Sequence, residues 1–145
     1  MNYLKVVCFL LLAGSSHAQI LSLNLNDGAR PYSNCAAVLY NGEMLVSEYS
    51  IYGECKLEQG QKGILSESTI KLTAYDRKPI MPIEFKVAVK NEGTNTIRMF
   101  DNKIYTQIPL EKVLEGLIPG DNIILMTTEK EYVLMHNEIK ITWGC

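Results

Sequence analysis

Few residues of this chain could take part in catalysis, and the histidines are the scarcest of them. The chain has two, and His17 lies in an N-terminal apolar segment, so His136 in VLMHNE is the one imidazole of the remaining sequence. A nucleophile needs a base oriented beside it, and no Gly-x-Ser-x-Gly turn accompanies His136. We therefore predict that His136 is a strand-end or loop residue and that the protein is not an enzyme.

Four aspartates occur in turn-forming sequences, namely Asp27 (NDG), Asp76 (YDRK), Asp101 (FDNK) and Asp121 (PGDN). Aspartate is favoured in turns because its carboxylate accepts hydrogen bonds from nearby backbone groups. We interpret all four as turn residues in preference to paired catalytic carboxylates. Calcium-loop spacing and a phosphate-binding glycine loop are both missing from the sequence, so no cofactor is expected.

Three cysteines follow the N-terminal segment, which itself contains Cys8. One disulfide and one unpaired thiol is the simplest arrangement in an oxidising compartment. We predict a Cys35–Cys55 disulfide, because the two residues flank a predicted hairpin, and closing that loop would stabilise the fold by about 3 kcal/mol. Cys145 could instead pair with either cysteine, or link two copies as a homodimer. With one histidine and no Cys-x-x-Cys spacing, no metal site is expected.

Tyrosines are the remaining candidates for binding, at positions 40, 49, 52, 75, 105 and 132. Tyr49 and Tyr52 bracket Ile51 in EYSIYGE and differ in strand parity, so they should face opposite sides of a strand. An exposed tyrosine could stack on a sugar ring or anchor a protein partner. Ordinary half-buried strand tyrosines are the more frequent alternative. Tyr49 and Tyr52 are the predicted partner or ligand contacts.

The first eighteen residues have the features of a signal peptide. Lys5 precedes the apolar run VVCFLLLAG, and Ser16 and Ala18 are the small residues that a signal peptidase recognises. The run is shorter than the roughly 20 residues that span a membrane, although an uncleaved anchor is the alternative. We expect the mature chain to begin at Gln19 and residues 19–145 to form a single domain without an integral membrane segment. The expected location is the periplasm or the cell exterior.

The charges argue against two classes of partner. The chain has 14 basic and 16 acidic residues, and they are interspersed along it. Nucleic acids and anionic membrane surfaces are bound by clustered lysine and arginine, and this sequence has no such block. We therefore expect neither as a partner.

Alternation of apolar and polar residues dominates the sequence and must position any site. It occurs in ILSLNLN (20–26), TIKLTAY (69–75), IEFKVAVK (83–90) and EIKITW (138–143). Such strands bury one face and leave the other in water, which is typical of antiparallel sheets. With about eight candidate strands, the sequence predicts an all-β, immunoglobulin-like antiparallel sandwich.

Two local signals refine this prediction. Asn41-Gly42 stands between two apolar runs, which indicates a type I′ hairpin. Pro109, followed by apolar residues at helical spacing, predicts one short helix near residues 109–116, which Gly116 ends. Pro119-Gly120-Asp121 then predicts a corner before a buried strand.

The order of these parts resembles a known family. The strand IEFKVAVKN, the corner LIPGDNIIL and the closing strand NEIKITW are similar to the last domain of the gliding-motility and type IX secretion protein GldM of Bacteroidetes, over residues 83–143. The resemblance implies a β-sandwich of the cell envelope. GldM is a longer protein with a membrane helix and several domains, and its glycine turn before the last strand is missing here, so no site residue carries over.

These observations favour an exported, non-enzymatic module that binds a protein partner in the cell envelope, as an accessory to a secretion or gliding system. Its contacts would be a sheet edge, whose unpaired backbone groups can accept another strand, or a surface of exposed tyrosines. The alternative is a small carbohydrate- or ligand-binding domain that uses tyrosine stacking. A hydrolase built around His136 is the third hypothesis.

Overall fold

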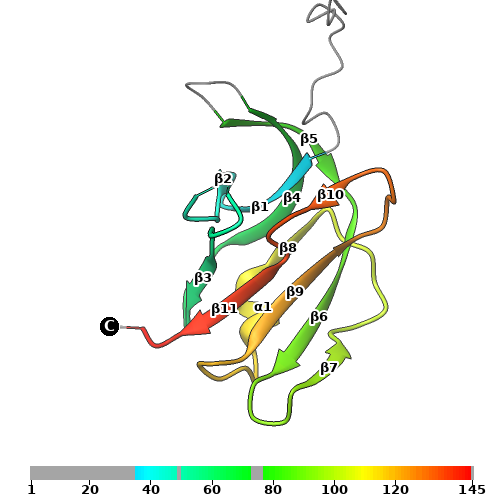
Figure 1. The fold of residues 1–145 in the computed structure, drawn as a ribbon. Helices are drawn as coiled ribbons and strands as arrows, with labels where there is room; N and C mark the ends of the chain where they lie inside the picture. Colours follow the sequence, from blue (N-terminus) through cyan, green and yellow to red (C-terminus); the bar gives the residue numbers. More distant parts are fainter. Residues whose placement is uncertain (1–34, 49, 73–76, 145) are drawn as a thin grey trace, which may run out of the picture.

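The computed structural model describes residues 35–48, 50–72 and 77–144 (Figure 1). The predicted signal peptide, the mature start at Gln19, the strand at 20–26, Tyr49 and Cys145 lie outside these residues. So do Asp27, Tyr75 and Asp76. The described residues form eleven strands and one helix: β1 (Cys35–Tyr40), β2 (Glu43–Met44), β3 (Cys55–Glu58), β4 (Ile64–Leu72), β5 (Arg77–Ile83), β6 (Phe85–Asn91), β7 (Thr96–Met99), β8 (Gln107–Pro109), α1 (Leu110–Leu114), β9 (Asn122–Thr127), β10 (Val133–Leu134) and β11 (Glu138–Thr142).

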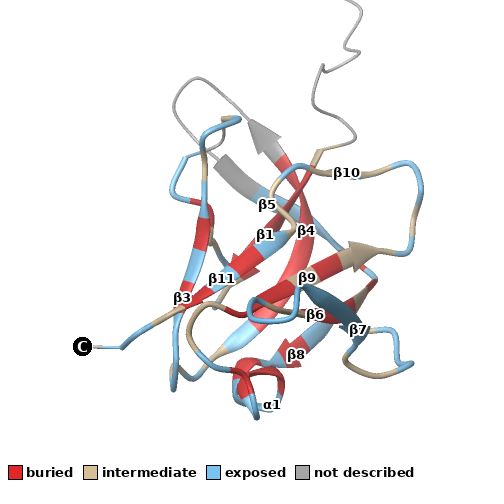
Figure 2. Cartoon of the chain, turned by 60° about the horizontal axis from the view of Figure 1, so that its bottom comes forward, coloured by how far each residue is buried: buried red, intermediate tan, exposed pale blue. Residues whose placement is uncertain are grey.

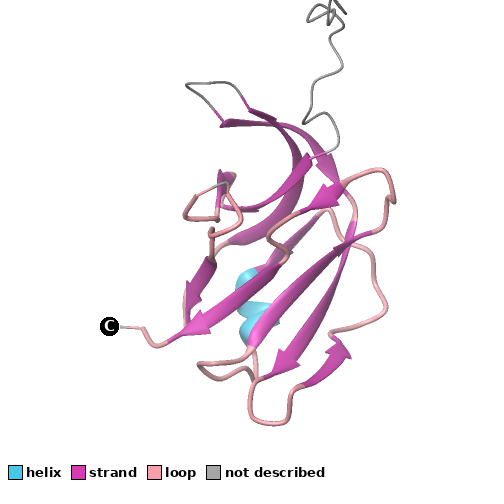
Figure 3. Cartoon of the chain, in the orientation of Figure 1, coloured by secondary structure: helices cyan, strands magenta, loops and turns pink. Residues whose placement is uncertain are grey.

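The strands form two sheets, and α1 is the only helix among the described residues (Figure 3). The first sheet has the order β10-β1-β4-β5, with β2 also paired to β1 and β8 to β4. The second has the order β3-β11-β9-β6-β7. The predicted all-β class with one short helix is therefore confirmed. The sheets are mixed rather than purely antiparallel, because β10 pairs with β1 and β3 with β11 in parallel.

Side chains from both sheets and from α1 form one hydrophobic core (Figure 2). The predicted alternation is confirmed in residues 83–90, where Phe85, Val87 and Val89 are buried and Glu84 is exposed. It is likewise confirmed in β11, where Ile139 and Ile141 are buried.

The run 83–90 is not one strand, contrary to the prediction. The chain leaves the first sheet after Ile83 and enters the second at Phe85, so Glu84 lies between the sheets. The Glu84 carbonyl accepts hydrogen bonds from the Thr128 N–H (3.0 Å) and hydroxyl (3.1 Å), which fasten the crossing to the end of β9. Alternation survives because Ile83 is buried at the end of β5 and Phe85, Val87 and Val89 are buried in β6.

The two local signals were largely correct. Asn41 and Gly42 have φ values of +51° and +85°, as a type I′ turn requires, and Tyr40 pairs with Glu43 across the hairpin. The helix, Leu110–Leu114, is shorter than the predicted 109–116, because Pro109 is its N-cap and Glu115 its C-cap. Gly116, at φ +80°, takes the left-handed conformation just beyond its end.

Candidate functional site

Asp121, in the predicted corner, is a buried structural residue. It is 2% exposed, and its carboxylate accepts three hydrogen bonds. One comes from the Ile118 N–H (3.1 Å) within the corner, and two come from the Asn91 side chain (3.2 Å) and the Glu92 N–H (3.1 Å). The turn role is confirmed, and Asp121 also fastens the corner to the turn between β6 and β7.

Asp101 also has a local role. One carboxylate oxygen accepts the Lys103 N–H (2.9 Å) and the other accepts the Tyr105 hydroxyl. The hydrogen bond with Tyr105 lowers the pKa of Asp101 and raises the pKa of Tyr105. Both groups are therefore occupied with each other rather than directed at a ligand.

The predicted Cys35–Cys55 disulfide is not formed in the structure, where both residues are free thiols. Cys35 lies in β1 of the first sheet and Cys55 in β3 of the second. The prediction assumed that both cysteines flank one hairpin, whereas the segment after the hairpin carries the chain to the other sheet before Cys55. Cys55 is buried with its sulfur 3.7 Å from the His136 carbonyl, and burial raises its pKa to about 11, so it stays a thiol at neutral pH.

His136 lies in the connection between β10 and β11, as predicted for a loop residue. It lines a shallow surface hollow of about 430 Å³, together with Lys56, Asn122, Glu138 and Lys140. No group of three metal-binding side chains occurs within the described ranges. In the same part of the chain, no helix has the length and apolar character needed to cross a membrane.

Tyr52 lies at the tip of a closed loop and is 78% exposed. Hydrogen bonds between Ser47 and Glu54 close the base of this loop, from the Ser47 N–H to the Glu54 carbonyl (3.1 Å) and from the Glu54 N–H to the Ser47 hydroxyl (3.2 Å). Ile51 beside it is equally exposed, at 79%. The structure thus presents two large side chains at one tip.

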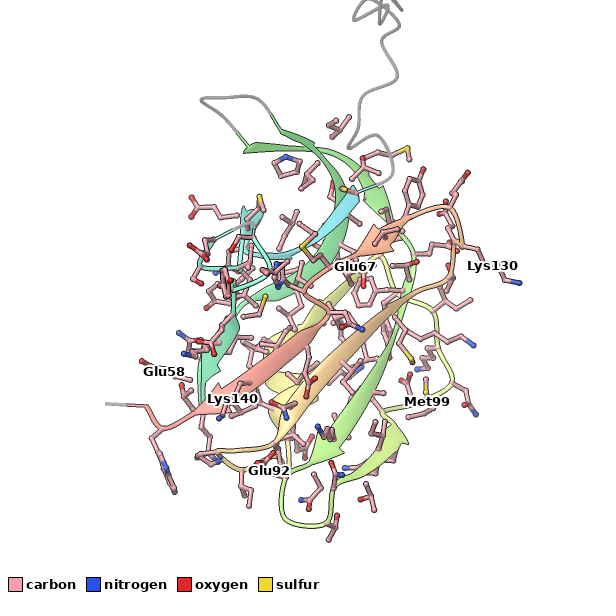
Figure 4. All side chains as sticks on the ribbon, in the orientation of Figure 1. Glu58, Glu67, Glu92, Met99, Lys130 and Lys140 are labelled. Atoms are coloured by element: carbon pink, nitrogen blue, oxygen red, sulfur yellow. The ribbon has the colours of Figure 1, made fainter. Side chains whose placement is uncertain are left out.

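The sequence did not single out β7, which is the most exposed strand for which all side chains are described. All four of its residues are exposed, including Ile97 at 62% and Met99 at 40%, and among the described residues it pairs with β6 alone (Figure 4). Alternation after the turn at 92–95, without a proline, is the signal that could have identified it. That pattern does not show that β7 is the last strand of its sheet among the described residues.

The hydrogen-bond pattern shows which backbone groups of β7 face outward. The Phe100 N–H donates to the Val87 carbonyl (2.9 Å), which makes this a hydrogen-bonded pair. Such pairs alternate along an antiparallel ladder. In the observed register the N–H and C=O groups of Ile97 and Met99 therefore point away from β6. No described residue bonds to them.

Comparisons with models of protein families, with curated proteins and with solved structures found no match.

Proposed function

We propose that the protein is an exported, non-enzymatic interaction module that binds an extended segment of a protein partner along β7. The single observation that carries the proposal is the row of outward backbone groups at Ile97 and Met99. An unpaired edge of this kind accepts another strand by completing its backbone hydrogen bonds. The exposed side chains of the two residues add apolar contact.

Two other edge strands, β5 and β3, are protected, which supports the assignment to β7. Strand β5 contains Pro79 and Pro82, which cannot donate to a further strand. In β3, the Glu58 N–H is already bonded to the Gln61 side chain (3.0 Å). Strand β7 contains no proline, and no described side chain accepts a hydrogen bond from its backbone N–H groups.

The proposed setting follows from the sequence. The signal-peptide features and the GldM resemblance favour a partner in the cell envelope, in the periplasm or at the cell surface, as part of a secretion or gliding system. An immunoglobulin-like sandwich is the proposed form of the two sheets, since a single core contains side chains of both.

Photo-crosslinking in envelope preparations tests the proposal. A crosslinking residue in place of Met99 should capture a defined partner, and adding Ile97→Pro should abolish the capture, because proline removes an outward N–H without breaking the bonds to β6. A crosslinker in place of Ile104, which is 52% exposed in a loop, is the matched control. Equal capture at both positions, or capture that survives Ile97→Pro, would refute the proposal.

The exposure of Tyr52 favours a second candidate function, the binding of a carbohydrate or small ligand by ring stacking. Tyr52→Ala should then abolish binding to a glycan array, whereas Ile51→Ala at the same tip should leave it in place. Binding that survives Tyr52→Ala would reject this function.

A further inference from the structure

We propose that the segment bound by β7 belongs to a different protein and carries an acidic residue between two apolar residues. The inference rests on the proposed function and names the occupant of the same edge.

The register defines what faces each position of an added strand. An antiparallel segment would form hydrogen-bonded pairs with Ile97 and Met99, the two residues with outward backbone groups. The side chains of those two partner residues would lie on the same face as Ile97 and Met99. The residue between them would lie on the opposite face, directly across from Arg98.

The face that contains Ile97 and Met99 favours apolar partner residues. Met99 lies directly across from Ala88 in β6, and Ala88 lies across from Ile124 in β9. Met99 is labelled beside β7 in Figure 4 and is 40% exposed, whereas Ala88 is buried. Apolar side chains added beyond β7 would extend this row and cover the exposed part of Met99.

The opposite face favours an acidic residue. Arg98 is exposed, and its guanidinium has no hydrogen-bond or ion-pair partner among the described residues. It borders a hollow of about 70 Å³ that Thr96, Gly116, Leu117 and Asp121 also line. The Asp121 carboxylate is nearly fully buried and already accepts three hydrogen bonds. A carboxylate opposite Arg98 would give the guanidinium a charge-assisted partner.

Arg98 also disfavours pairing of β7 with β7 of a second copy of the chain. Two β7 strands can pair antiparallel through both outward residues only if Ile97 faces Met99 of the other copy, and this register places Arg98 opposite Arg98. Like charges directly opposite each other destabilise a pair of strands. A register centred on Ile97 or on Met99 avoids the clash but keeps only one hydrogen-bonded pair. The edge therefore favours a strand of a different protein over β7 of a second copy.

The test uses two short blocked peptides of alternating threonine and valine, with the central threonine replaced by glutamate in one and by lysine in the other. Each is titrated into the full chain while NMR follows the amides of Ile97 and Met99. The glutamate peptide should bind about tenfold more tightly than the lysine peptide. Arg98→Glu should reverse the order, Lys103→Glu on the neighbouring loop should leave it unchanged, and Ile97→Pro should abolish binding of both.

The outcomes separate the two proposals. Equal affinity for both peptides, lost in Ile97→Pro, would overturn the acidic preference and leave strand addition at β7 intact. No shift at Ile97 and Met99 with either peptide, or binding unaffected by Ile97→Pro, would overturn strand addition itself.

Mixing copies tests the exclusion of self-pairing. Labelled wild-type protein should show β7 shifts with unlabelled Arg98→Glu protein, because arginine then faces glutamate, and about tenfold weaker shifts with unlabelled wild type. Equally strong shifts with wild type would overturn the exclusion of a second copy.

Discussion

Glu67 is the most unusual titratable residue of the core, and the pH dependence of stability should depend on it. It lies in β4, across from Val38 in β1 and Ile83 in β5, and is fully buried (Figure 4). Neither carboxylate oxygen has a hydrogen-bond partner among the residues that the structure describes. Burial without a partner disfavours the charged form and raises the pKa of Glu67 from 4.5 to about 8.

The cost of ionising Glu67 follows from this pKa. Each pKa unit corresponds to about 1.4 kcal/mol, so the ionised carboxylate costs the folded state about 5 kcal/mol relative to a group with a pKa of 4.5. Because the pKa of Glu67 is raised in the folded state, the protonated carboxyl contributes stability to the folded protein. This contribution is fully present below about pH 4.5 and is lost as pH rises through about 8. Native domains have free energies of unfolding upward of about 5 kcal/mol, so this cost is comparable to the whole stability of the least stable ones.

Urea denaturation of the wild type and of Glu67→Gln measures this effect, because glutamine keeps the size of the side chain but cannot ionise. Between roughly pH 5 and roughly pH 9, the free energy of unfolding of the wild type should fall by about 4 kcal/mol relative to Glu67→Gln. Other titrating groups cancel in this difference. Glu84→Gln, at an exposed position directly after Ile83, the residue across from Glu67, is the matched control and should track the wild type.

Two results would refute the reasoning. A difference between wild type and Glu67→Gln that stays constant over this pH range would mean that Glu67 ionises at the same pH in the folded and unfolded states. A difference that changes in the opposite direction would mean that the folded state stabilises the carboxylate.

Three further predictions concern the loops and the free thiols. Gly53→Ala places a Cβ 1.9 Å from the Glu48 carbonyl oxygen, so thermal unfolding should show a loss of about 2 kcal/mol; an unchanged melting temperature would contradict this packing. Asp121→Ala removes three hydrogen bonds and should cost about 3 kcal/mol in urea, whereas a loss well below about 1 kcal/mol would contradict its role as a fastening. The Cys55 thiol, with its pKa raised to about 11, should be alkylated far more slowly at neutral pH than Cys35; mass-spectrometric mapping that finds equal rates would reject this.

The sequence predicted what depends on neighbouring residues. Alternation at Phe85, Val87 and Val89 identified a buried face, because a strand turns successive side chains to opposite sides. Asn41-Gly42 identified its hairpin, because few residues tolerate two consecutive positive φ values. Both signals depend on a few neighbouring residues, so they produce the same sequence pattern whatever the overall fold.

What the sequence did not predict depends on distant pairing. The change of sheet at Glu84 leaves alternation intact, so period alone cannot reveal it. The polar run at 66–69 gives no sign of burial, yet it lies in β4 between β1 and β5, and all four of its residues are buried, Glu67 completely. The separation of Cys35 from Cys55 likewise follows from which sheet each strand joins.

The candidate site combines the two kinds of information. Local alternation could identify β7 as a strand but not as the edge of its sheet, because that depends on distant pairing. The corner that holds the turn before β7 in place was visible in the sequence. Asp121 was identified as a corner residue, and its carboxylate holds Asn91 and Glu92, the residues through which β6 turns toward β7. A corner that also fastens the turn before an exposed strand keeps the strand's backbone groups in register. If a partner strand adds to β7 as proposed, ordering these groups in advance would lower the entropy cost of adding it, and the buried carboxylate would contribute to binding without contacting the partner.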